Sequence, residues 1–110
     1  MRIWDLKPSQ LCAKHLAAEH RELHAIWSVL TQNKNGYAKH PETLRWKNKL
    51  AALYQRHEQL VREFKKRDWK HYSPLNKKLA RGKIIQDYLL DSIDKQKKIL
   101  KNKPCACLLS

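Results

Sequence analysis

The feature that most constrains the fold is a series of apolar side chains spaced by three and four residues between Trp46 and Phe64. This spacing places the side chains on one face of an α-helix, which we expect to run from about Pro41 to Arg67. With only two glycines and four prolines, the sequence lacks the turn residues that a β-sandwich needs. The expected buried face consists of Trp46, Leu50, Leu53, Tyr54, His57, Leu60, Val61 and Phe64.

Two further amphipathic segments flank this helix. The first is predicted to run from Ser9, its expected N-cap, to about Thr31, and the second from about Lys83 to Lys101. Residues 1–8 are expected to be extended, because a proline disfavours helix at the residue before it. The expected buried side chains are Cys12, Leu16, Leu23, Trp27 and Leu30 in the first helix, and Ile84, Ile85, Tyr88, Leu89, Ile93 and Leu100 in the last.

Size and charge narrow the class of protein. The chain has 110 residues, the length of one domain. We expect residues 1–110 to form one all-α domain, a small bundle of three main helices with an extended N-terminal arm. Its 24 Lys and Arg against 10 Asp and Glu give a net charge of +14. A basic helical bundle most often binds nucleic acid, because its cations release counterions from the phosphate backbone. No apolar segment is long enough to span a bilayer, so membrane association is not expected.

The cysteines indicate the redox compartment. Cys12, Cys105 and Cys107 are an odd number, and two of them are too close together in sequence to cross-link a fold. A disulfide framework is therefore not expected, and this usage is typical of a reducing, cytoplasmic compartment. The last four residues fit the pattern of a prenylation box, but no other feature of the sequence indicates a membrane anchor. The role of the tail Cys105–Ser110 is left open.

Two histidines have the spacing of a metal-ligand pair. His20 and His24 are four residues apart and so share one helix face. A zincin motif places its glutamate directly after the first histidine, whereas here Arg21 separates His20 from Glu22. We therefore expect no metal and interpret these histidines as solvated or facing DNA. A metal-dependent nuclease using His20, His24 and Glu22 is kept as a third hypothesis.

Two stretches of the sequence resemble a known family. The segment from Arg2 to Leu23 contains the motif His-Leu-x-Ala-Glu-x-Arg-Glu-Leu, which begins at His15. A second stretch, from Lys49 to Arg67, matches in the same order, and together the two cover about half of the chain. In both, the chain resembles the pyrimidine-dimer DNA glycosylases of the phage endonuclease V type.

The resemblance implies a bifunctional DNA glycosylase and AP lyase that uses no metal or small-molecule cofactor. In that family the N-terminal α-amine attacks C1′ of the damaged nucleotide and forms an imine. A glutamate on the first helix assists base loss and β-elimination. Carried over by position, the catalytic residues are Met1, which supplies the amine, and Glu22. Arg2, His15 and Arg21 are the expected DNA-binding residues.

The sequence departs from the family pattern at two places near the expected site. It opens Met-Arg where the phage member exposes a Thr, and a bulky second residue keeps the initiator methionine in place. Ala25 stands where other members have an arginine, one helical turn past the glutamate. Neither change removes the expected nucleophile, the N-terminal α-amine. Its pKa is about 7.7–8.0 against about 10.4 for lysine, so a usable fraction of it is uncharged at neutral pH. The preferred lesion is therefore left open, whereas the expected reaction is still that of the family.

The expected function is DNA repair on pyrimidine dimers or related lesions. The expected partner is double-stranded damaged DNA, bound by a monomer in the cytoplasm, at the nucleoid. The alternative is a non-enzymatic basic helical protein that binds nucleic acid and keeps the family's scaffold. The two hypotheses differ in whether blocking the N-terminus abolishes strand cleavage.

Overall fold

Helices make up the regular structure of the protein. The computed structural model describes residues 2–36, 38–70, 73–103 and 107. Within these ranges there is no β-strand, and the expected all-α fold is confirmed. No helix in the described ranges is both long enough and apolar enough to cross a membrane. The elements in chain order are a 3-10 turn (Pro8–Gln10), α1 (Ala13–Gln32), α2 (Pro41–Trp46), α3 (Leu50–Lys66), a second 3-10 turn (Lys77–Leu79) and α4 (Ile93–Lys101).

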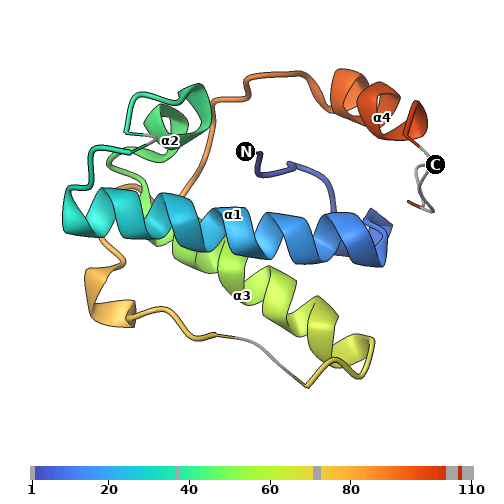
Figure 1. Ribbon diagram of the computed structural model, residues 1–110, viewed down its shortest axis with the longest axis horizontal. Coiled ribbons are helices and arrows are strands. Elements are labelled where there is room, and N and C mark those ends of the chain that lie inside the picture. Colours follow the sequence, from blue (N-terminus) through green and yellow to red (C-terminus); the bar gives the residue numbers. More distant parts are fainter. Residues whose placement is uncertain (1, 37, 71–72, 104–106, 108–110) are drawn as a thin grey trace.

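The long helices α1 and α3 form the centre of the fold, with α3 crossing against α1 (Figure 1). α2 lies over the carboxyl end of α1, and α4 lies over its amino end. The arm of residues 2–7 lies between α2 and α4 and runs along α1, so these residues are in the interior of the arrangement. The core is formed by Ile3, Trp4, Leu6, Leu11, Leu16, Leu23, Ile26, Trp27, Trp46, Ala52, Leu53, Leu60, Phe64 and Leu100.

The first helix begins later than the sequence predicted. Its N-cap is Cys12, whereas Ser9, the expected cap, lies inside the first 3-10 turn. The helix ends at Asn33, which adopts the left-handed conformation with φ 51° and so closes the helix as a C-cap. Of the predicted stripe, Leu16, Leu23 and Trp27 are buried, and Cys12 and Leu30 are half-buried.

The second predicted helix is interrupted. α2 ends at Trp46 and α3 begins at Leu50, because Asn48 between them has φ 63°. Asparagine is one of the few residues that adopt this left-handed conformation at low cost, and a single such residue ends helical hydrogen bonding. The apolar face continues through the break, so its residues still reach one core.

The third predicted helix is wrong over its first half. α4 begins only at Ile93, and residues 83–92 are not helical. The carbonyl groups of Arg81 and Lys83 accept hydrogen bonds from the backbone of Ala51 and Ala52, at 2.8 and 3.1 Å. These are N–H groups of the first turn of α3, which no helix can satisfy internally. The chain here is therefore held by tertiary bonds that outweigh its helix propensity.

The same departure corrects the predicted core. Ile84, Ile85, Tyr88 and Leu89 were expected to be buried, but they are exposed, Ile84 and Ile85 to more than three-fifths of their surface. Their spacing of one, three and four residues buries a face only in a helix, and no helix forms there. In α4 itself Leu100 is buried, as predicted, whereas Ile93 is only half-buried.

Candidate active site

The arm brings the start of the chain onto α1. The backbone N–H of Arg2 donates a hydrogen bond to Oε2 of Glu22 at 2.6 Å. Glu22 lies at the edge of the core and is partly exposed. Met1, the predicted nucleophile, lies outside the described residues. The first backbone nitrogen of the described chain is therefore held by the carboxylate that the sequence singled out.

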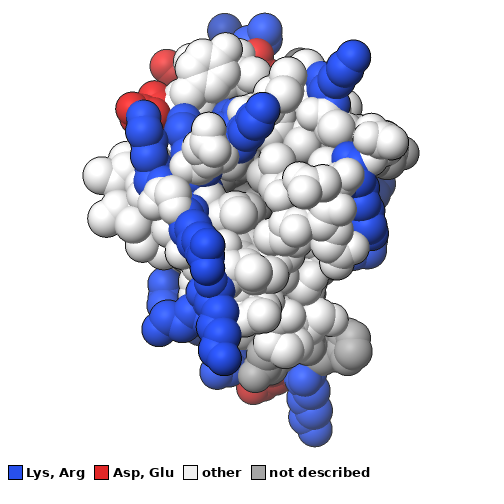
Figure 2. Space-filling model, turned by 90° about the vertical axis from the view of Figure 1, so that its left-hand side faces the viewer, with Lys and Arg blue, Asp and Glu red and all other residues white. Residues whose placement is uncertain are grey.

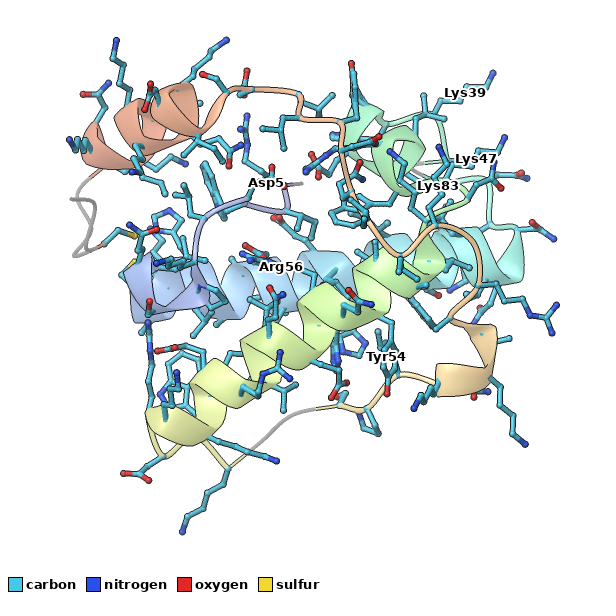
Figure 3. The ribbon with its side chains drawn as sticks, turned by 180° about the vertical axis from the view of Figure 1, so that it is seen from behind. Asp5, Lys39, Lys47, Tyr54, Arg56 and Lys83 are labelled. Atoms are coloured by element: carbon cyan, nitrogen blue, oxygen red, sulfur yellow. The ribbon has the colours of Figure 1, made fainter. Side chains whose placement is uncertain are left out.

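A buried ion pair holds the middle of the arm. The backbone N–H of Trp4 donates to Oε1 of Glu19 at 3.0 Å, and the Arg56 guanidinium donates to both Glu19 oxygens at 2.7 and 3.1 Å. Arg56 also donates to the carbonyl of Leu6 at 2.9 Å (Figure 3). Burial raises the pKa of Glu19, and the charge and hydrogen bonds of Arg56 oppose this shift. The arm is thus fixed to α1 and α3 together.

Arg45 fixes the arm from the side of α2. Its guanidinium is almost fully buried and pairs with Asp5 of the arm and with Glu42, the latter at 2.7 Å. It also donates to the carbonyl of Ile3 at 3.3 Å and to that of Tyr88 at 2.6 Å. Arg45 therefore ties the arm to the segment that precedes α4. Buried charges of this kind are tolerated because each is paired and hydrogen-bonded.

The side chain of Arg2 is positioned rather than free. Its Nη1 pairs with Oδ2 of Asp91 at 2.8 Å, and the guanidinium lies 4.9 Å from the centre of the Trp4 ring. The hydrogen bond from Arg2, followed by that from Lys95, holds the pKa of Asp91 below its usual value. A third of the Arg2 side chain remains exposed. Arg2 can therefore meet an anion from outside while its backbone stays on Glu22.

A pocket of about 610 Å³ opens beside these groups, between the arm, α1, the start of α2 and α4. Its lining includes Arg2, His15 and Glu22 together with the cations Lys14 and Lys103. The structure therefore brings three of the predicted site residues to one pocket. The volume lies within the range of about 300–1,000 Å³ in which proteins hold small ligands.

Arg21 does not lie at this pocket. It is exposed and lines a second pocket with His20 and His24 on another face of α1. Neighbouring residues on a helix point about 100° apart, and here Arg21 and Glu22 line different pockets. The structure separates Arg21 from the other predicted DNA-binding residues.

His15 is engaged inside the protein. It is 8% exposed, its ring packs edge-on against Trp4, and its Nδ1 lies 3.1 Å from Sγ of Cys12 and 3.5 Å from Sγ of Cys107. Burial works to raise the pKa of Cys12, but hydrogen bonds from His15 and Cys107 lower it to about 6. Nδ1 of His15 is therefore in contact with two sulfur atoms, at the edge of the pocket. Of the tail Cys105–Ser110, only Cys107 is described.

In the described part of the chain, two groups of side chains place ligand atoms close enough together to hold a metal ion. One is Cys12, His15 and Cys107, and the other is His20, His24 and His57. Glu22 belongs to neither, so the geometry does not assemble the metal-dependent nuclease that combines His20 and His24 with Glu22. His57 was not predicted as a ligand, because its spacing placed it in the apolar face of α3. The sequence signal that could have indicated this ligand was a histidine within a predicted apolar face.

The comparison with protein families decides the affiliation. A family model described as pyrimidine dimer DNA glycosylase matches residues 1–77. The chain belongs to the pyrimidine dimer DNA glycosylase family. The resemblance found in the sequence is thereby confirmed, and the substrate class of the family is DNA. Searches of curated proteins and of solved structures found no match.

The glycosylase match covers the arm and α1 to α3 but not α4. The matched region includes the arm and Glu22. It also includes Arg45 and Arg56, the two residues that fix the arm. Asp91, which pairs with Arg2, lies outside it. The carboxyl-terminal third of this family member thus contributes a contact to the site from a segment that the family model does not describe.

Proposed function

We propose that the protein is a DNA repair glycosylase with AP lyase activity, acting on pyrimidine dimers or related lesions in double-stranded DNA. The observation that carries the proposal is the 2.6 Å hydrogen bond between the Arg2 backbone and Glu22. The α-amine belongs to the preceding residue, and consecutive Cα atoms are about 3.8 Å apart. The proposed nucleophile therefore belongs to the residue bonded to Arg2, whose backbone Glu22 binds.

In the proposed reaction the free amine of Met1 attacks C1′ of the damaged nucleotide. A bond forms between the amine nitrogen and C1′, the bond from C1′ to the base breaks, and Glu22 assists departure of the base. Opening of the sugar ring gives a protonated imine. Glu22 then takes a proton from C2′, and elimination of the 3′ phosphate cuts the strand. The α-amine suits this role because, unlike a lysine, a usable fraction of it is uncharged at neutral pH.

The DNA is expected to lie across the end of the molecule at α2 and over the pocket. Figure 2 shows Lys and Arg side chains forming a band on this end. Lys39, Lys47 and Lys83 gather beside α2 (Figure 3) and are exposed. Lys39 directly precedes His40, which lines the pocket with Glu22. Such a band neutralises phosphates without reading sequence, as a lesion-specific enzyme requires.

Borohydride trapping tests the mechanism. With a duplex that contains one abasic site, reduction should fix a covalent complex whose adduct maps to Met1 in peptide mass spectrometry. An adduct on a lysine, or no adduct, would contradict the proposed nucleophile.

The role of Glu22 is tested by Glu22→Gln, which should abolish strand cleavage and leave DNA affinity within a few-fold. Asp94→Asn is the matched control, since it removes one exposed negative charge on α4, away from the lining of the pocket. It should cleave like the wild type. Cleavage by Glu22→Gln at the wild-type rate would remove Glu22 from the reaction.

Acetylating the N-terminus distinguishes the proposed enzyme from the alternative, a DNA-binding protein without activity. Loss of nicking with retained binding supports the enzyme. An unmodified protein that binds abasic DNA and never nicks it supports the alternative.

A further inference from the structure

Three histidines from two helices converge on the face of α1 that carries Arg21. His20 and His24 come from α1 and His57 from α3. Their Nε2 atoms lie 3.2 Å apart for His20 and His24, 3.2 Å for His24 and His57, and 3.3 Å for His20 and His57. Zinc held by tetrahedral nitrogens at about 2.0–2.1 Å places those nitrogens about 3.3–3.4 Å apart. The histidine triangle therefore has the dimensions of one face of a zinc tetrahedron.

Hydrogen bonds alone do not explain this triangle. A neutral imidazole has one N–H, and Nδ1 of His57 lies 3.1 Å from Oε1 of Glu58, which can only accept when ionised. If His57 donates there, its Nε2 carries a lone pair. That lone pair faces the other two Nε2 atoms and the carbonyl oxygen of Ser73, at 2.9 Å. One cation bound to the three Nε2 atoms satisfies their converging lone pairs.

Metal binds the neutral form of imidazole. His57 is fully buried, and burial, together with the neighbouring His57, lowers the pKa of His24. The contact between Glu58 and His57 is the carboxylate–histidine pair that orients ligands in zinc sites. The site therefore has both a set of ligand atoms and a group that fixes one of them.

The remaining position of the tetrahedron is open to solvent. A pocket of about 540 Å³ lies beside the cluster and is lined by His20, Arg21, His24, Phe64, Trp69 and Ser73. The aromatic rings in its wall are themselves in contact, His20 with Phe64 and Phe64 with Trp69. Three protein ligands with one open position are typical of zinc sites that accept water or an anion.

We propose that His20, His24 and His57 form a zinc site that joins α1 to α3 and leaves one coordination position open beside Arg21. The site is separate from Glu22 and takes no part in the imine chemistry, so the proposal stands independently of the proposed function. An imidazole set of this kind selects zinc or a similar borderline divalent ion over calcium or magnesium.

Metal binding is tested on the full chain, stripped with chelator and titrated with Co²⁺ and with Zn²⁺. We expect one ion per chain at the cluster. Bound Co²⁺ should show the visible bands of a tetrahedral site without the near-ultraviolet band of a thiolate ligand. That band distinguishes the histidine cluster from Cys12, His15 and Cys107. The spectrum of a thiolate site, or no binding of either ion, would overturn the proposal.

Variants locate the site. His20→Gln and His24→Gln change partly exposed residues, so both should fold, which far-ultraviolet circular dichroism verifies. Each should lose the ion and the rise in melting temperature that Zn²⁺ gives the wild type. Glu58→Gln should weaken binding by about 10- to 100-fold, as loss of a ligand's hydrogen-bond partner does. His40→Gln, on the N-cap of α2, is the matched control and should bind like the wild type. Wild-type binding by folded His24→Gln would refute the site.

Discussion

At the scale of single residues, the ion pair between Arg2 and Asp91 links the arm to the segment before α4. Asp91→Asn should lower the free energy of unfolding at neutral pH, because Arg2 loses its anionic partner. The pKa of Asp91 is held below its usual value by Arg2 and Lys95. The unfolded chain therefore takes up the proton first as the pH falls. The contribution of the pair is present above the ordinary pKa and is lost as the pH falls through the lowered one.

Urea denaturation of wild type and Asp91→Asn at a series of pH values checks this expectation. The difference in stability should be constant above about pH 5 and shrink toward zero in acid. Asp68→Asn is the control. Asp68 is exposed and has φ 59°, a conformation that asparagine also adopts. A difference for Asp91→Asn that persists at the lowest pH would show that the carboxylate charge is not what stabilises the arm.

Some features of the candidate site could be predicted from single residues in the sequence, and others could not. Glu22 could be placed at the edge of the core because helical periodicity fixes the direction of each side chain. The hydrogen bond between Arg2 and Glu22 was not predicted: the resemblance assigned Met1 and Glu22 to one site, and no local pattern joins residues twenty positions apart. His57 was missed because an apolar stripe says nothing about which other helix it meets. Its partners became visible only when α1 and α3 were packed together.

At the scale of elements, the junction between α2 and α3 depends on a glycine far away in the sequence. Gly82 has φ 84°, and a Cβ there would lie 2.2 Å from the backbone oxygen of Asn48. The next residue, Lys83, donates its N–H to that same oxygen at 2.9 Å. Gly82→Ala should therefore destabilise the protein by about 2–4 kcal/mol through backbone strain and overpacking.

Gly36→Ala is the matched control for this prediction, because a Cβ at Gly36 meets nothing within 4 Å. Its effect should stay within about 0.5 kcal/mol, as for most surface changes. Chemical denaturation of the two variants side by side gives the comparison. Equal stability of Gly82→Ala and Gly36→Ala would mean that the loop moves away from Asn48 at no cost.

The same junction explains which elements the sequence could predict. α1 and α3 follow from their own periodicity, because each buries one continuous face. Residues 83–92 have a helical pattern as well, but their backbone is recruited by α3 and by Arg45. Those partners lie some thirty to forty residues earlier in the chain. A local sequence pattern contains no information about hydrogen bonds to such distant partners. The predicted helix was wrong over residues 83–92 for that reason.

At the scale of the whole molecule, the net charge of +14 supplies most of the affinity for DNA on the proposed function. The cations are not equivalent, because only some surround the pocket that holds Glu22. Lys14 and Lys103 line that pocket, whereas Arg62 and Lys66 line another one at the carboxyl end of α3. If DNA lies over Glu22, the first pair neutralises phosphates and the second does not.

The salt dependence of binding distinguishes the two faces. Each lost phosphate contact lowers the slope of log K against log salt by about 1, so Lys14→Ala with Lys103→Ala should lower it by about 2. Arg62→Ala with Lys66→Ala removes the same charge and should leave the slope unchanged. Fluorescence anisotropy of an abasic-site duplex at several salt concentrations measures both. If the second pair lowers the slope as much as the first, phosphate binding is not organised around Glu22, and a lesion would have to reach the carboxylate from another direction.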